Sequence, residues 1–253
     1  MQRFMSHRYQ AFFEHHDLTD FDAFWSLSLT PVDVPNLERG GHSEVARITL
    51  EATGRTPRTF FVKRQTNHIG RSLQRPFGEP TFAREARNIE TFQRLGIPAL
   101  ESAYYEERKR SGQWQAILVT PALEGYTDMV ERHAQWHATD EATRKATVEA
   151  CAGLLRQLHE RRWRHGSLYA KHVFLRSDDT APGGFDARFI DLEKSRPLIN
   201  ARREKRRDLA IFARRLTAWR PDEWQRFLSH YLNRPAHSLT VRNLQQALHL
   251  AGD

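Results

Sequence analysis

Several segments in the first half of the chain have a hydrophobic pattern that alternates with a period of two, which is typical of strands. The first thirty residues are an exception, because their aromatic residues follow an amphipathic pattern that predicts one or two short helices. After the Gly-Gly turn at 40–41, apolar and polar residues alternate as far as residue 51. A turn-like segment at 52–58 separates this strand from a second β-rich run, TFFVKRQ at 59–65. We therefore expect a hairpin.

A helix is expected over residues 81–95, between a Pro-Thr start and a Gly-x-Pro stop. Its apolar stripe is formed by Phe82, Ile89 and Phe92. Glu85 falls in the middle of that stripe, and a carboxylate that faces a core needs a cationic partner. Lys63 and Phe61 point to one face of the preceding strand, and Phe60 and Val62 to the other. The pattern predicts a Lys63–Glu85 ion pair between sheet and helix.

The second half of the chain is dominated by helical periodicity. One more strand is expected at 114–120, and an amphipathic helix at 144–163 carries Cys151 on its apolar stripe as a core residue. Two short β-rich runs, HVFLR (172–176) and RFIDL (188–192), flank a turn-rich segment. Three later stripes predict helices: Leu209, Phe212, Leu216 and Trp219; Trp224, Phe227 and Tyr231; Val241, Leu244 and Leu248.

These elements predict an α+β chain with two unequal lobes. The N-lobe, 1–124, comprises an N-terminal helical segment, a β-sheet and one helix. The C-lobe, 125–253, is larger and mainly helical.

Composition excludes several classes of protein. With 28% charged and 39% apolar residues the chain has ample material for a core, and it has no apolar run of the roughly 20 residues needed to cross a bilayer. The single cysteine cannot form an intrachain disulfide, and the first sixteen residues lack the apolar region of a secretory signal, so we expect a cytoplasmic protein. The surplus of 39 basic over 31 acidic side chains, a net charge of +8, favours anionic partners; a solvated basic face is the alternative.

Four features that a phosphotransfer site needs occur in order along the chain. They are the GGHSEV turn, Lys63, Glu85 and a β-rich hairpin that carries HGSLYAKH and then IDLE. In such a site a lysine contacts the phosphates, a carboxylate holds that lysine, and an acidic residue binds the metal that bridges the phosphates.

The order of these elements resembles the lipopolysaccharide kinase family (Kdo/WaaP type), in particular its InaA-like branch, over roughly residues 37–218. The strings that carry the resemblance are LERGGHSEV, FFVK, FAREARNIETFQRLGIP, AILVTPALEG, HGSLYAKHVFL and FIDLEKSR. The family resembles eukaryotic protein kinases in fold. The resemblance therefore implies a bilobal protein-kinase-like fold, with ATP and Mg²⁺ or Mn²⁺ between the lobes. It implies phosphorylation of a lipopolysaccharide inner-core sugar.

The resemblance also implies roles for residues of the nucleotide site. Gly40 and Gly41 match the glycine-rich loop, although the full G-x-G-x-x-G pattern is missing. Lys63 matches the strand lysine that holds the phosphates, and Glu85 its helix partner. The hinge that meets the adenine corresponds to residues 118–124, including Leu118, Thr120 and Leu123.

In the second lobe the resemblance implies a catalytic loop and a metal site. His165 matches the first residue of the catalytic-loop motif and, with Ser167, would sit at the acceptor hydroxyl. Asp191 takes the place of the metal-binding Asp, and His172 stands where protein kinases place a second metal ligand. Asp208 matches a buried Asp that anchors the catalytic loop.

One departure concerns the catalytic loop, where the expected His-x-Asp is replaced by His165-Gly166-Ser167. A Ser hydroxyl cannot act as a general base near neutral pH. A slow kinase, a kinase in which Glu193 substitutes as the base, and a pseudokinase that binds nucleotide or a partner as a scaffold are therefore all open. A kinase of another small hydroxyl compound uses the same fold and is a further alternative.

The densest basic stretch, 196–207, holds six Arg and Lys residues and directly follows the IDLE segment. One interpretation is a clamp for an anionic glycolipid acceptor, or a contact with the inner leaflet that would place the protein at the inner face of the inner membrane. The other is a solvated helix start. Nucleic acid is disfavoured, because no helix-turn-helix, RNP or zinc-finger signature accompanies the charge.

Overall fold

The computed structural model describes residues 3–32, 34, 36–37, 40–72, 75–181 and 183–250. The chain divides into two compact units, one of residues 1–91 and 100–124 and the other of residues 92–99 and 125–253. Glu38 and Arg39 of the string LERGGHSEV, and Pro182 of the turn-rich segment, lie outside the described residues.

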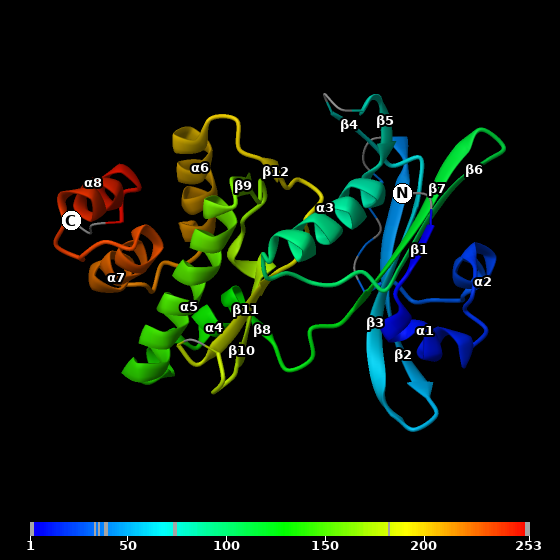
Figure 1. The fold of residues 1–253 in the computed structure, drawn as a ribbon, viewed down its shortest axis with the longest axis horizontal. Helices are drawn as coiled ribbons and strands as arrows, with labels where there is room; N and C mark the ends of the chain where they lie inside the picture. The colour runs from blue at the N-terminus through cyan, green and yellow to red at the C-terminus, as the bar shows by residue number, and fades with distance from the viewer. Residues whose placement is uncertain are drawn as a thin grey trace. The chain divides into compact units, whose positions relative to one another are not determined.

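The first unit is built on a five-stranded sheet with the order β1-β6-β7-β3-β2 (Figure 1). All of its described pairings are antiparallel. The elements of this part of the chain are β1 (Arg3–Met5), α1 (His7–Glu14), α2 (Phe21–Ser26), β2 (His42–Ala52), β3 (Arg55–Thr66), β4 (Ile69–Ser72), β5 (Arg75–Pro80), α3 (Thr81–Leu95), β6 (Tyr104–Arg110) and β7 (Gln113–Pro121).

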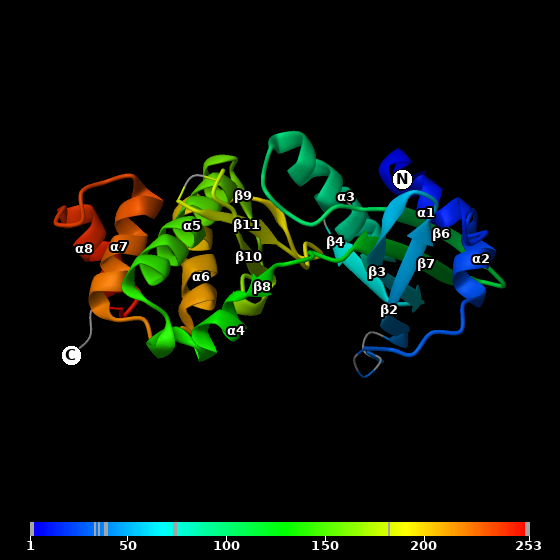
Figure 2. The same cartoon turned by 90° about the horizontal axis from the view of Figure 1, so that it is seen from below.

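Helices α1 and α2 cover one face of this sheet, and α3 lies on the other side (Figure 2). Phe13 of α1 and Phe24 of α2 are fully buried against Phe60 of β3 and Tyr104 of β6, with ring centroids 4.4–5.2 Å apart. Because Phe60 points into this aromatic core, Lys63 points to the opposite face, as the alternation predicts.

The helix predicted over 81–95 is confirmed as α3 with the same bounds, and the hairpin of β2 and β3 is confirmed with a shorter turn. The strands β1, β4, β5 and β6 were not predicted. The sequence of β6, YYEERKR, is polar over most of its length and ends exposed, so it lacks the alternation that identifies a strand.

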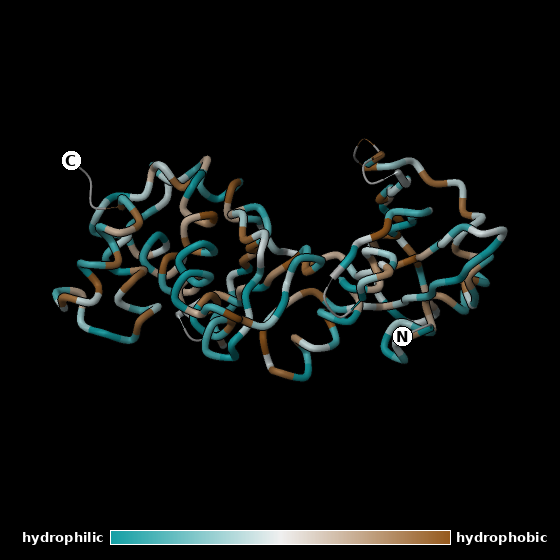
Figure 3. Tube along the Cα trace, turned by 90° about the horizontal axis from the view of Figure 1, so that it is seen from above, coloured by the Kyte–Doolittle hydropathy of each residue, from teal (hydrophilic) through white to brown (hydrophobic). Residues whose placement is uncertain are grey.

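The second unit combines small sheets with helices. A three-stranded sheet has the order β11-β10-β8, and β12 pairs with β9. The elements are β8 (Thr127–Asp128), α4 (Met129–Ala134), η2 (Trp136–Ala138), α5 (Glu141–Glu160), β9 (Trp163–Arg164), η3 (Ala170–His172), β10 (Val173–Ser177), β11 (Phe185–Phe189), β12 (Arg196–Pro197), α6 (Ala201–Ala213), α7 (Pro221–Leu232) and α8 (Leu239–Ala247). Along the helices the tube alternates between hydrophilic and hydrophobic colours, as amphipathic helices do (Figure 3). Cys151 is fully buried on α5, and burial raises the pKa of its thiol to about 12, so it is the core residue that was predicted.

Two boundaries in this unit correct the prediction. The strand expected at 188–192 is β11, Phe185–Phe189, which starts earlier because Phe185, Ala187 and Phe189 alternate inward directly after a glycine turn. Asp191 is not part of it, since its left-handed backbone (φ 57°) cannot continue a strand.

The prediction that one helix carries the apolar stripe from Leu209 to Trp219 is also wrong for the second half of that stripe. Helix α6 ends at Ala213, and the chain continues in tight turns in which the amides of Leu216 and Trp219 each donate to the carbonyl three residues back. These turns still bury Leu216 and Trp219.

Candidate functional site

The predicted ion pair between strand and helix is present in the first unit. Lys63 Nζ on β3 lies 2.6 Å from Glu85 Oε1 on α3. The Glu85 side chain is 3% exposed and the Lys63 side chain 17% exposed, so the carboxylate is buried and the lysine is partly open to solvent. A buried carboxylate thus fixes the position of a partly exposed positive charge.

Gln65, which sequence reasoning missed, positions the helix that carries Glu85. Its Oε1 accepts hydrogen bonds from the Phe82 amide (3.1 Å) and the Thr81 hydroxyl (2.9 Å), and its Nε2 donates to the His68 carbonyl (2.9 Å). Because the first amides of a helix have no partner within the helix, this side chain replaces a cap. Gln65 lies two residues after Lys63 on the same strand face, and that spacing is the signal that could have identified it.

The glycine pair forms the turn that leads into β2. Gly40 adopts a left-handed conformation (φ 70°), and a Cβ at Gly41 would lie 2.4 Å from the carbonyl carbon of Asn67. A side chain is therefore excluded at Gly41, and at Gly40 it would strain the backbone although the space there is open. Backbone hydrogen bonds join Asn36 and Ser43 on either side of this turn.

The three predicted hinge residues lie at the end of β7 or directly after it. Leu118 pairs with Lys63 and Thr120 with Phe61 in the β3–β7 register, and both side chains are buried. Leu123 follows the strand and is partly exposed. Contact of these residues with adenine stays a prediction.

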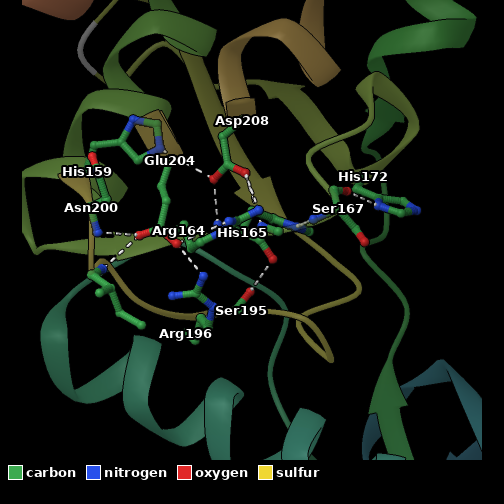
Figure 4. A network of polar contacts seen from close by, with 12 residues as sticks. His159, Arg164, His165, Ser167, His172, Ser195, Arg196, Asn200, Glu204 and Asp208 are labelled. Carbon is green, nitrogen blue, oxygen red and sulfur yellow. Dashed lines mark hydrogen bonds and ion pairs between the residues drawn. The ribbon is translucent and has the colours of Figure 1, made fainter. Parts of the chain in front are cut away.

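In the second unit the catalytic-loop motif is held by Asp208 of α6 (Figure 4). The Asp208 carboxylate accepts hydrogen bonds from the backbone amides of His165 (2.7 Å) and Gly166 (3.1 Å), and lies 3.4 Å from His159 Nε2 and 3.6 Å from an Arg164 nitrogen. Burial alone would raise the pKa of Asp208, but the hydrogen bonds from His159 and His165 and the charge of Arg164 lower it. The loop is thus anchored by an ionised, fully buried carboxylate.

Gly166 is required by the close approach of two backbone segments. It has φ 81°, and a Cβ there would lie 2.5 Å from the carbonyl oxygen of Lys194. The Ser195 hydroxyl also donates to the His165 carbonyl (3.2 Å). The segment that follows Asp191 is therefore packed directly on the predicted catalytic loop.

A second carboxylate, missed by sequence reasoning, holds the same segment from its other end. Glu204 of α6 accepts hydrogen bonds from Arg196, from Arg164 (3.3 Å) and from the backbone amides of Ile199 (2.7 Å) and Asn200 (3.1 Å) (Figure 4). In the sequence, a Glu in the first turn of a helix is indistinguishable from an ordinary solvent-facing Glu. The two arginines come close to Glu204 only in the folded chain.

His165 is fully buried, and both ring nitrogens are used within the unit. Nε2 donates to the Ile190 carbonyl (2.9 Å), and Nδ1 accepts from the Ser167 amide (3.4 Å). Burial, and then the nearby His172, lower the pKa of His165 to about 4. We therefore treat His165 as a neutral positioning residue for the loop.

This buried neutral imidazole predicts a stability that depends on pH. Because the unfolded chain binds protons near pH 6.5 and the folded chain does not, stability is full above pH 6.5 and is lost as the pH falls toward 4. His165 alone would contribute a loss of roughly 3 kcal/mol across that window. Urea unfolding of the wild type and of His165→Gln between pH 7 and 4.5 should show a shallower dependence in the variant. The exposed His137→Gln is the control, and equal slopes for both variants would contradict this assignment.

Asp191 is presented on a left-handed backbone next to His172. Its side chain is 42% exposed, and its Oδ2 lies 3.4 Å from His172 Nδ1. That nitrogen also donates a hydrogen bond to the Ser167 carbonyl (2.8 Å). Nδ1 therefore carries the proton, and it offers Asp191 an N–H group and no lone pair. Residues in sparsely populated backbone conformations concentrate at functional sites.

The donor set fits Mg²⁺ through Asp191. Among the described residues no three His, Cys, Asp or Glu side chains gather into a group that could hold a metal. Mg²⁺ does not need one, since it commonly binds one or two carboxylates together with waters and substrate phosphates. His172 would bind a metal only through Nε2, and imidazole is a poor ligand for Mg²⁺.

Known proteins resemble this chain in sequence and in structure. Residues 22–231 match the Lipopolysaccharide kinase (Kdo/WaaP) family. Protein InaA of Escherichia coli (strain K12) is 32% identical over 195 residues, which cover 76% of this chain and 83% of the relative. The solved structure described as "WaaP in complex with acyl carrier protein" superposes with a TM-score of 0.68 over 100% of both chains, at 18% identity. At that identity the likeness concerns the fold.

Proposed function

Because the chain belongs to the lipopolysaccharide kinase (Kdo/WaaP) family, whose members are kinases, we propose that it transfers a phosphoryl group from ATP to a sugar of the lipopolysaccharide inner core. The family and the kinase-like fold expected from the sequence are confirmed. In the proposal, residues 1–124 act as the N-lobe and residues 125–253 as the C-lobe of such an enzyme.

The Lys63–Glu85 pair is the observation that supports this function best. A buried ion pair adds little to stability, because desolvation of the two charges offsets their attraction. Its use is to hold one ammonium group in a fixed position. In the proposal Lys63 contacts the phosphates of ATP, Glu85 orients Lys63, and the turn at Gly40 and Gly41 lies against the nucleotide.

Asp191 is the proposed ligand of the metal ion, Mg²⁺ or Mn²⁺. When bound, the ion neutralises charge that develops on the phosphates. In the proposal His172 keeps Asp191 in place through the contact at Nδ1.

The acceptor hydroxyl is proposed to lie at Ser167. This residue is 5% exposed, and its carbonyl accepts hydrogen bonds from the Tyr169 amide (2.7 Å) and His172. The loop therefore keeps an ordered conformation although the usual carboxylate is absent. That absence favours a second candidate, a pseudokinase that binds nucleotide without efficient transfer.

The basic stretch 196–207 is the proposed contact with an anionic membrane surface or glycolipid. Arg196 is engaged with Glu204, whereas Arg202, Arg203 and Arg207 are exposed on α6. Within the described residues, no helix is long and apolar enough to cross a bilayer. In the proposal this stretch would associate with the cytoplasmic face of the inner membrane through charge.

Calorimetric titration of ATP into the protein, in the presence of Mg²⁺ or Mn²⁺, tests the nucleotide site without knowledge of the acceptor. Loss of a charge-assisted contact to phosphate in Lys63→Met should weaken binding about 10–100-fold. In Asp191→Ala the dependence on metal should disappear. The exposed Lys145→Met is the matched control and should bind as the wild type does.

Metal-dependent binding that is lost in the two site variants would support the kinase proposal and justify an acceptor screen with lipopolysaccharide core. Absence of binding by the wild type with either metal would overturn it and leave a kinase-shaped scaffold. ATP binding without phosphoryl transfer to any core acceptor would favour the pseudokinase. Phosphoryl transfer to soluble hydroxyl compounds would favour the small-molecule kinase.

A further inference from the structure

A cavity of about 450 Å³ lies beside the catalytic loop in the second unit. It is lined by Val130, Tyr169, Ala170, Lys171, Ile211 and Arg215. These residues come from α4, from the loop and η3 that follow Ser167, and from α6 and the residues directly after it. The volume lies within the range of small-molecule sites.

Two positive charges line this cavity without a counter-charge. Within the described part of the chain, neither Lys171 nor Arg215 has a hydrogen-bond or ion-pair partner for its side chain. Other arginines of this unit do have one: Arg164 and Arg196 contact Glu204, and Arg188 contacts Asp186. Two cations that face one cavity without a carboxylate create a positive potential, which favours an anionic ligand.

The remaining lining suits a sugar ring rather than a bare ion. Tyr169 keeps 39% of its surface exposed, and its ring packs edge-on against His172 with centroids 5.7 Å apart. A fixed aromatic face next to Val130 and Ile211 offers an apolar surface to the C–H groups of a carbohydrate, while the phenol can donate a hydrogen bond.

The cavity also lies next to the position proposed for the acceptor. The Tyr169 amide donates to the Ser167 carbonyl at 2.7 Å, so the loop that lines the cavity is bonded directly to that residue. The exposed arginines of α6 before residue 208, in contrast, line no part of this cavity.

We propose that this Lys171–Arg215 cavity binds the acceptor as an anionic sugar, one that carries a phosphate or a carboxylate. Lys171 and Arg215 contact the anionic group, and Tyr169 packs on the ring. The proposal rests on the proposed function in one respect, because it takes the ligand to be the acceptor whose hydroxyl lies at Ser167.

Binding of soluble sugars in the absence of ATP tests this site independently of catalysis. The probes are glucose 6-phosphate, glucuronate, neutral glucose and inorganic phosphate, each titrated into the full chain and followed by NMR or calorimetry. The two anionic sugars should bind at least tenfold more tightly than glucose, and more tightly than inorganic phosphate. Lys171→Gln and Arg215→Gln should each weaken binding of the anionic sugars about five- to tenfold.

Two exposed residues outside the cavity provide matched controls. Arg214→Gln removes the neighbouring guanidinium, and Lys145→Gln removes an ammonium group on α5; both should bind the probes as the wild type does. Thermal unfolding of each variant establishes that it is folded before binding is compared.

Three results would overturn the proposal. They are equal affinity for glucose and glucose 6-phosphate, binding of inorganic phosphate as tight as that of the sugars, and equal loss in Arg214→Gln and Arg215→Gln. Loss of binding to phosphatidylglycerol vesicles in the cavity variants, without any loss of sugar binding, would assign the charges to a membrane instead. Failure of the proposed function is distinguishable, because it would appear as absent ATP binding while these sugar titrations remain interpretable.

Discussion

Replacement of Ser167 by Asp is expected to raise the rate of phosphoryl transfer to the acceptor about 10²–10⁴-fold. The reason is that the motif His165-Gly166-Ser167 keeps its backbone anchor on Asp208 but lacks the carboxylate that takes the acceptor proton. A Ser hydroxyl is not a base near pH 7, whereas an Asp carboxylate is ionised there. Single-turnover transfer of the γ-phosphate to lipopolysaccharide core, for the wild type and the variant, measures the effect.

Ser167→Asn is the matched control for this substitution. Asn has nearly the shape of Asp but cannot accept the proton, so its rate should stay at or below that of the wild type. Equal rates for the Asp and Asn variants would show that the general base is not the missing group. A rate for Glu193→Gln below that of the wild type would then indicate that Glu193 supplies the base.

The two outcomes distinguish the two candidate functions. A large gain would mean that the wild-type chain is a kinase with one weakened group, since positioning and metal electrostatics supply much of the acceleration in phosphoryl transfer. No gain, in a protein that binds ATP and metal, would favour the pseudokinase. In that case the ordered loop around Ser167 serves binding rather than proton transfer.

The parts of the site that could be predicted are those set by local periodicity. Alternation on one strand placed Lys63 opposite the aromatic core, and the apolar stripe of one helix placed Glu85 inward. Two local patterns and the rule that a buried charge needs a partner were therefore sufficient for the ion pair.

The parts that could not be predicted depend on contacts between distant segments. Glu204 gathers Arg164 and Arg196, which are 40 and 8 residues away, and nothing in its neighbourhood distinguishes it from a surface residue. The left-handed backbone at Asp191 was also missed, because the run RFIDL predicts a strand as far as residue 192 whereas β11 ends at Phe189. The strand β6 was missed because its pairing with β7, not its own sequence, makes it a strand.

Asp208→Ala is expected to lower the free energy of unfolding by about 3–5 kcal/mol, the largest effect on stability that we predict. The carboxylate is fully buried and accepts from the amides of His165 and Gly166, so its removal leaves one buried and one partly buried donor without this acceptor. Among the described residues it also leaves the buried Arg164 with Glu204 as its one remaining counter-charge. Urea unfolding at pH 7 measures the change.

The comparison with an exposed carboxylate makes this prediction specific to burial. Asp222 pairs with Arg220 at 3.2 Å, but their side chains are 67% and 56% exposed, and such surface pairs contribute at most about 1 kcal/mol. Asp222→Ala should therefore change the unfolding free energy little. If Asp208→Ala were equally mild, the catalytic loop would not depend on its carboxylate anchor. Since the same hydrogen bonds fix the backbone amides of His165 and Gly166, the Asp208 variant should also lose whatever transfer activity Ser167→Asp gains.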